Sequence, residues 1–230
     1  QNGESEIILA GGVESMSNIP LFFNKKMVGL FTKLSKARSL PQKLAAIFSF
    51  RPSFLAPVVG IVQGLTDPIS GLIMGCTAEN IAKDFKITRK EQDEFALRSH
   101  QKAEAAMNNG VFAEEIIPVF NNDPRKSLMI EEDEGVRKGQ TIEALAKLKP
   151  FFEKVTGTVT VGNSSQVTDG AAFAILMSES KAKELGYTPL GYIRDFAYAG
   201  MDPSRMGLGP VFASKKLFDK TGLSLKDIEL

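Results

Sequence analysis

Two short runs without a polar side chain constrain the fold of this 230-residue chain more than any other feature. The first run is Ile7–Ala10, which Gly11 and Gly12 follow, and the second is Phe173–Met177. An uninterrupted apolar run of this length, bounded by turn residues, is typical of a strand that is buried on both faces. Such strands occur in parallel α/β sheets. We therefore expect an α/β fold in which both runs are buried strands and the first ends at the glycine pair.

Helix signals lie between and after these runs. Thr88 and Glu91 have the spacing of a capping box, and Asn109-Gly110 is a stop signal, so a long helix is expected between them. Shorter helices are expected from near Thr77 to Lys83, over Glu179–Leu185 up to Gly186, and from Pro210 to a stop at Gly222. A fourth short helix is expected to start at Asp169–Ala172.

The remaining segments predict strands or loops. The β-branched run Thr158–Val161, which ends at Gly162-Asn163, is typical of a strand that leads into a turn, and Gly191–Ala199 alternates like a half-buried strand. Another strand is expected to start near Asp227. Residues 121–139 are polar and charged, which indicates a surface loop.

A basic segment interrupts an otherwise acidic chain. The whole chain has a net charge of +1, which argues against a generally basic nucleic-acid binder, but residues 15–66 hold seven Lys and Arg side chains and no acid. The segment is rich in Leu, Phe and scattered prolines, so short helices and loops are expected. One interpretation is contact with an anionic membrane or an acidic partner. The other, which the prolines favour, is a solvated region packed on its own domain.

The single cysteine and single histidine exclude an intrachain disulfide and leave few metal ligands, so no metal site is expected and a reducing compartment fits best. No signal peptide and no membrane span are expected. Cys76 precedes a predicted helix start, where a thiol can become a nucleophile, and His100 is the one imidazole base available. They are 24 positions apart, and a lone cysteine is more often a small apolar filler. We favour the filler.

The turn over residues 162–170 has two interpretations. Its glycines, amides and hydroxyls could bind a polar ligand, or it could be a capped connection with Asp169 as the N-cap. Its glycines match neither a dinucleotide fingerprint nor a P-loop.

Several segments resemble the thiolases, acyl-CoA acetyltransferases that make or cleave 3-oxoacyl-CoA. The similar segments are residues 10–17 (AGGVESMS), 74–80 (MGCTAEN), 91–96 (EQDEFA) with Ser99 and His100, 146–152 (AKLKPFF), 157–165 (GTVTVGNSS), 168–172 (TDGAA), and the pairs 202–203, 206–207 and 209–210. The basic segment and Phe54–Pro57 resemble the branch that contains the trifunctional-enzyme β-subunits, the 3-ketoacyl-CoA thiolases of fatty-acid β-oxidation.

The resemblance implies a thiolase-like α/β fold, of which this chain is the central part. Residues 1–17 would be the tail of the first part of the N-terminal half, and residues 18–164 an inserted loop domain. Residues 165–186 would return to the N-terminal half, and residues 187–230 would open the C-terminal half. The family's nucleophilic cysteine would lie before Gln1, and its histidine and second cysteine beyond Leu230. No catalytic residue is therefore expected in this chain, which alone should be inactive.

What the resemblance carries over is substrate binding. Ser165 matches the serine that hydrogen-bonds the pantetheine arm of coenzyme A (CoA), and Val161 matches a small residue beside that arm. Met74, Phe152 and Met206 match apolar residues that line the tunnel near the thioester, although without the resemblance they would be assigned to the core. Ala144 departs from the family at a position where several relatives have a serine near CoA.

The resemblance also implies the partners. CoA and acyl-CoA would be substrates, and no cofactor would be bound covalently. We expect a homodimer or higher oligomer, a hydratase/dehydrogenase α-subunit as a partner, no nucleic acid, and a location in the bacterial cytoplasm or the mitochondrial matrix. The alternative is a non-catalytic module that docks on a membrane or a partner through residues 15–66.

Overall fold

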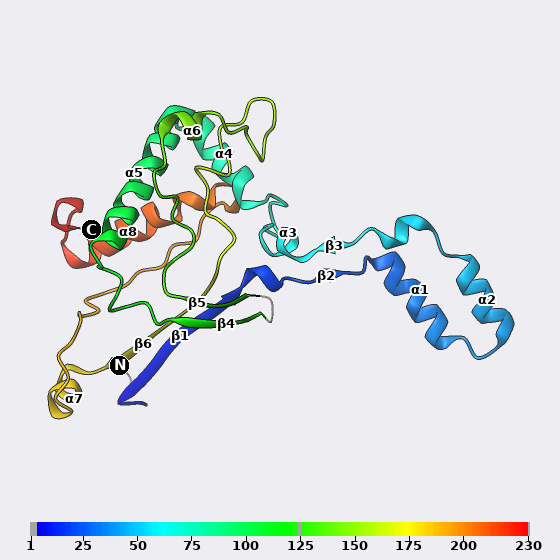
Figure 1. Ribbon diagram of the computed structural model, residues 1–230, viewed down its shortest axis with the longest axis horizontal. Coiled ribbons are helices and arrows are strands. Elements are labelled where there is room, and N and C mark those ends of the chain that lie inside the picture. The colour runs from blue at the N-terminus through cyan, green and yellow to red at the C-terminus, as the bar shows by residue number, and fades with distance from the viewer. Residues whose placement is uncertain (1–3, 124–125, 230) are drawn as a thin grey trace. The chain divides into compact units, whose positions relative to one another are not determined.

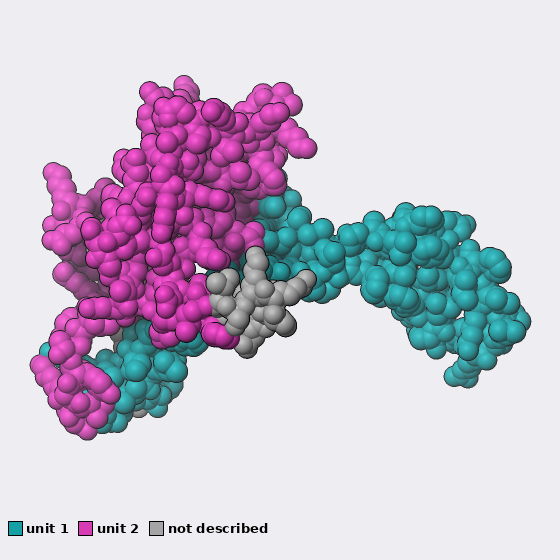
Figure 2. Space-filling view, viewed as in Figure 1, with its two compact units in different colours: residues 1–73, 169–181 teal, residues 74–168, 182–230 magenta. Residues whose placement is uncertain are grey.

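The computed structural model describes residues 4–123 and 126–229. They form two compact units (Figure 2), the first made of residues 1–73 and 169–181 and the second of residues 74–168 and 182–230. Each unit is described by itself.

The first unit contains a two-stranded ribbon (Figure 1). Strand β1 (Ile7–Ser15) pairs antiparallel with β6 (Asp169–Met177), and Ile7 lies opposite Met177. Both apolar runs are therefore strands, as predicted. Their expected burial is wrong for this chain, because nearly all their side chains are exposed, and their pairing is antiparallel instead of parallel.

Neither glycine of β1 ends the strand, and Gly11 allows a close approach of the partner strand. A Cβ on Gly11 would overlap the ring of Phe173 on β6, so glycine lets this ring lie across the partner strand. The predicted helix start at Asp169–Ala172 is also wrong, since these residues begin β6. The Asp169 carboxylate accepts hydrogen bonds from the hydroxyl and the backbone N–H of Ser17, which lower the pKa of Asp169. Asp169 thus fixes the end of the ribbon instead of capping a helix.

The basic segment folds into short pieces, as its prolines predicted. Its elements are the 3₁₀ turns Met16–Asn18 and Pro52–Leu55, the paired strands β2 (Leu21–Phe22) and β3 (Val58–Val59), and the helices α1 (Lys25–Lys36), α2 (Leu40–Phe48) and α3 (Gly60–Gly64). Asn24 caps α1, because its Oδ1 accepts hydrogen bonds from the N–H groups of Lys26 and Met27. Leu30 and Ala46 are the buried residues of α1 and α2.

The second unit is mainly helical. Its elements are α4 (Met74–Asp84), α5 (Arg89–Asn108), α6 (Ile142–Ala146), the 3₁₀ helix η3 (Pro203–Leu208), α8 (Gly209–Thr221) and the 3₁₀ turn η4 (Leu225–Asp227). Helix α7 (Glu179–Glu184) joins the two units in sequence. The predicted capping box of α5 is confirmed, since the Glu91 carboxylate accepts the Thr88 N–H at 2.7 Å, which lowers the pKa of Glu91. Gly186 and Gly222 follow α7 and α8 in the left-handed conformation that ends a helix.

Four local predictions are wrong. Residues 121–139 are not all loop, because β4 (Val119–Asp123) pairs antiparallel with β5 (Lys126–Ile130); strand pairing uses backbone groups, so the polar composition concealed it. Thr158–Val161 and Gly191–Ala199 pair with no strand in the described ranges. The expected strand near Asp227 is the turn η4, and Leu230 lies outside the described residues. No described helix is both long and apolar enough to cross a membrane.

Candidate substrate-binding site

The predicted binding residues Val161 and Ser165 lie in and directly after residues 158–164, which we name the anchored turn. Its first residues are bound to α4. The carboxylate of Glu79, which is only 3% exposed, accepts the N–H groups of Thr158 at 2.9 Å and Val159 at 2.8 Å, and also the Thr158 hydroxyl. A side chain thus satisfies N–H groups that a partner strand would otherwise bind. This is why the β-branched run forms no strand.

Helix α5 holds the other side of the anchored turn. The Asn163 amide donates to Asp93 at 3.0 Å, while its oxygen accepts the Thr160 N–H at 2.7 Å. Asp93, which is 2% exposed, also accepts from Arg89 at 2.7 Å. Arg89 in turn donates to the carbonyls of Leu145 and Leu148. Helix α5, the anchored turn and the end of α6 are therefore joined through a partly buried ion pair, in which Asp93 is the buried member.

Hydrogen bonds within the anchored turn fix its shape. The fully buried Thr160 accepts the Gly162 N–H with its hydroxyl, and its carbonyl accepts the Ser164 hydroxyl at 2.6 Å. Leu145 of α6 lies beneath the turn, because a Cβ on Gly162 would come within 2.8 Å of its Cδ2. The turn thus combines internal hydrogen bonds with apolar support.

The two predicted pantetheine contacts are accessible. Val161 is 64% exposed, and Ser165 is exposed directly after the last bonded residue of the turn. Within the described part of the chain, the Ser165 hydroxyl has no hydrogen-bond partner. A fixed backbone next to a free hydroxyl is an arrangement that can bind the amide of a ligand.

Helix α4 supports the predicted apolar residues. Met74 is its first residue and is 45% exposed. A Cβ on Gly75 would overlap the ring of Phe152, so the structure brings Phe152 against the start of α4. Phe152 also contacts Phe151 edge to face, with ring centroids 5.0 Å apart. The next residue, Glu153, forms an ion pair with Lys83 further along α4, which lowers the pKa of Glu153.

Met206 lies on η3, which is bound to helix α4. The amide of Asn80 donates to the Ser204 carbonyl at 3.1 Å, and Arg205 pairs with Asp84 and Asp202. The Ser204 N–H and hydroxyl, followed by Arg205, lower the pKa of Asp202. Met206 is 41% exposed. Helix α4 is therefore the element common to Met74, Phe152 and Met206.

Other candidate positions take no part in this arrangement. Cys76 lies inside the first turn of α4, half-buried and unpaired, and the Nδ1 of His100 accepts the backbone N–H of Arg137. No hydrogen bond joins Cys76 to His100 in the described ranges, and the filler interpretation of Cys76 stays a prediction. Ala144 lies in α6, where its N–H binds Thr141. The described residues contain no cluster of three or more His, Cys, Asp or Glu that could hold a metal ion.

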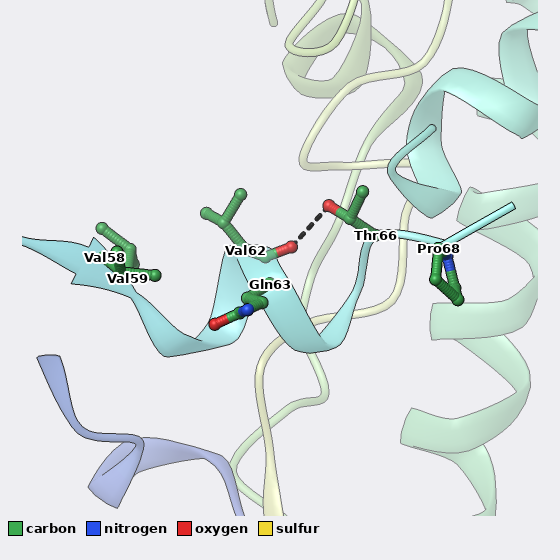
Figure 3. A pocket seen from close by; sticks show the side chains of 6 residues that line it. All are labelled: Val58, Val59, Val62, Gln63, Thr66 and Pro68. Atoms are coloured by element: carbon green, nitrogen blue, oxygen red, sulfur yellow. Dashed lines mark hydrogen bonds between the residues drawn. The ribbon is translucent and has the colours of Figure 1, made fainter. Parts of the chain in front are cut away.

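A hollow of about 510 Å³ lies elsewhere, in the first unit (Figure 3). Val62 and Gln63 of α3 line it, together with Val58, Val59, Thr66 and Pro68. None of the five predicted binding residues belongs to it.

Sequence reasoning missed the residues that build the anchored turn. Glu79 entered only as a letter of a similar segment and Asn163 only as part of a turn signal, and no local pattern shows that they bind partners 79 and 70 positions away. The ion pair of Arg89 and Asp93 had a usable signal, since the two are spaced i,i+4 on a predicted helix.

Comparison with known proteins identifies the family of the chain. Residues 1–180 match the family "Thiolase, N-terminal domain", and residues 187–230 match "Thiolase, C-terminal domain". The mitochondrial trifunctional enzyme subunit beta of Bos taurus is 40% identical over all 230 residues, which cover 47% of that protein. A 3-ketoacyl-CoA thiolase of Pectobacterium atrosepticum is 42% identical over 229 residues, which are 99% of this chain and 51% of the relative.

Solved structures show the same fold. The Bacillus anthracis acetyl-CoA acetyltransferase has a TM-score of 0.83 at 39% identity, over 100% of this chain and 53% of that one. Human mitochondrial 3-ketoacyl-CoA thiolase in complex with CoA has a TM-score of 0.78 at 36% identity, over 99% and 52%. The chain thus spans about half the length of the relatives it matches. Because the N-terminal-domain match alone covers well over half of these residues, the chain belongs to the thiolase family.

Proposed function

We propose that this chain is the CoA-binding central part of a 3-ketoacyl-CoA thiolase of fatty-acid β-oxidation. The observation that carries the proposal is that both thiolase domain families match in their proper order along the whole chain. The complete protein would cleave a 3-oxoacyl-CoA with a second CoA to give acetyl-CoA and a shortened acyl-CoA. The domain division at residues 18, 165 and 187 remains part of the proposal.

Within this reaction the chain would bind and orient substrate. Ser165 would donate or accept a hydrogen bond at the pantetheine amide, and Val161 would leave room for the arm beside it. Met74, Phe152 and Met206 would provide an apolar wall near the thioester without unpaired polar groups. The acyl-carrying cysteine, its histidine and the acid/base cysteine that thiolase chemistry requires would come from polypeptide outside these residues.

The first prediction separates binding from catalysis. A polypeptide that contains this chain together with the missing catalytic groups is expected to cleave acetoacetyl-CoA in the presence of CoA, while the 230-residue chain alone has no thiolysis activity. The measurement is the loss of the 3-oxoacyl-CoA absorbance with purified protein. Activity of the chain alone that Cys76→Ala abolishes would make Cys76 the nucleophile and contradict the proposal.

The second prediction concerns the free hydroxyl. In the complete enzyme, Ser165→Ala is expected to weaken CoA binding by about 0.5–1.5 kcal/mol, the net contribution of one hydrogen bond. Isothermal titration calorimetry with CoA measures the change, and Ser180→Ala, an exposed serine on α7, is the control with unchanged affinity. An unchanged affinity for Ser165→Ala would remove this residue from the site.

The proposal extends to assembly and location. The relatives named trifunctional enzyme subunit beta motivate a hydratase/dehydrogenase α-subunit as partner and the mitochondrial matrix as one location. The bacterial relatives motivate the cytoplasm as the other. A homodimer or higher oligomer is proposed from the family resemblance alone, and size-exclusion chromatography with light scattering would test it.

The basic segment motivates an additional membrane contact, which would accompany the thiolase function and not replace it. Helices α1 and α2 combine lysines with exposed apolar side chains such as Phe31, Leu40 and Phe48. This combination suits an anionic lipid surface. Co-sedimentation of the chain with anionic liposomes tests this contact, and the comparison is a variant with reversed charge at Lys25, Lys26, Lys33 and Lys36. Binding that changes neither with salt concentration nor with the charge reversal would exclude the contact.

A further inference from the structure

We infer that Glu79 is a positioning residue for CoA, acting through the anchored turn on Ser165. The inference rests on the proposed function and goes beyond it, since it assigns a role in substrate binding to a side chain that touches no substrate. The first observation is the burial of a carboxylate, which is stable inside a protein only when its oxygens are satisfied. Backbone N–H groups of the anchored turn donate the hydrogen bonds that the Glu79 carboxylate needs.

The contacts of Glu79 set the position of the turn along α4. One oxygen, Oε1, accepts from both Thr158 N and Val159 N, and the other, Oε2, accepts from Thr158 N at 3.0 Å and Thr158 Oγ1 at 3.1 Å. Gln92 of α5 donates to the same hydroxyl at 2.9 Å. The anchored turn cannot shift along α4 without losing the charge-assisted hydrogen bonds from two consecutive backbone N–H groups to the Glu79 carboxylate.

The constraint continues toward Ser165. Thr160 follows Val159 directly, and its carbonyl accepts the Ser164 hydroxyl, so residues 158–164 are linked by hydrogen bonds into one piece. Ser165 is the next residue and has no hydrogen bond of its own in the described ranges. The position of its hydroxyl is therefore set by the turn, and the turn is set by Glu79 at one end and by Asp93 through Asn163 at the other.

A double-mutant cycle in the complete enzyme tests the inference. Glu79→Gln keeps the size of the side chain but replaces one acceptor oxygen with an amide group. We expect it to weaken CoA binding about threefold to tenfold, no more than Ser165→Ala does, with kcat changed less than twofold. In the Ser165→Ala background the same substitution is expected to have less than a twofold effect, because the contact it positions is already absent. Calorimetry and steady-state kinetics give both quantities.

The controls distinguish positioning from general stability. Glu94→Gln makes the same change on the exposed surface of α5 and should leave CoA affinity unchanged. If Glu79→Gln does not fold, Thr158→Val replaces it in the cycle, since it removes the hydroxyl shared by Glu79 and Gln92 and keeps the backbone N–H; a smaller effect with the same non-additivity is expected.

The outcomes separate the inference from the proposed function. Additive effects of Glu79→Gln and Ser165→Ala, or unchanged CoA affinity in folded Glu79→Gln protein, would overturn the positioning role and leave the thiolase proposal standing. A wild-type enzyme that neither binds CoA nor cleaves a 3-oxoacyl-CoA would overturn both.

Discussion

Arg89→Met is expected to lower the free energy of unfolding by about 3–5 kcal/mol, because it leaves the buried Asp93 carboxylate without its cation. The same substitution removes the donor to the carbonyls of Leu145 and Leu148, so α5 also loses its hydrogen bonds to the end of α6. Methionine fills most of the volume of the arginine side chain, so the loss of stability reflects the missing charge and hydrogen bonds. Urea-induced unfolding followed by circular dichroism measures it.

Lys90→Met is the matched control for this prediction. Lys90 is the next residue on α5 and forms the same kind of i,i+4 pair with Glu94, but both side chains of that pair are exposed. Its removal should cost about 0.5 kcal/mol or less. Equal losses for the two variants would show that burial does not govern the stability of the Arg89–Asp93 pair.

Leu145→Ala is expected to cost about 2–5 kcal/mol, the range for truncation of a completely buried leucine. The cavity would open directly beneath Gly162, so the shape of the anchored turn should also loosen. Thermal unfolding by calorimetry measures the first effect. Leu190→Ala, at a fully exposed position, should change stability by about 0.5 kcal/mol or less. A small loss at Leu145 would mean that the surrounding side chains collapse into the space.

Signals that act within one turn of helix were readable from the sequence. The capping box of Thr88 and Glu91 placed the start of α5, and Gly222 placed the end of α8, because both effects involve backbone groups a few residues away. The start of α4 was missed by three residues, which moved Cys76 inside the helix. A helix boundary without a strong cap gives little local signal.

Features that depend on distant partners were not readable. The antiparallel pairing of β1 with β6 joins segments about 160 residues apart, and an apolar run alone is compatible with either strand direction. Thr158–Val161 had the composition of a strand, yet Glu79 provides its hydrogen bonds. The proposed binding role of Ser165 came from the family resemblance alone. The structure adds the hydrogen bonds that hold the turn before Ser165, and neither composition nor residue spacing indicates them.

The separation between Glu79 and Thr158 has a consequence for how the molecule assembles. Two residues that lie 79 positions apart must meet before the first of these hydrogen bonds forms. Closing so long a segment costs conformational entropy, which only the completed contacts offset. Helix α5 can form early from its own cap and local spacing. The anchored turn makes its bonds to Glu79 and Asp93 only once α4 and α5 have both been brought to it, so the segment that leads to Ser165 takes its shape from contacts distant in the sequence.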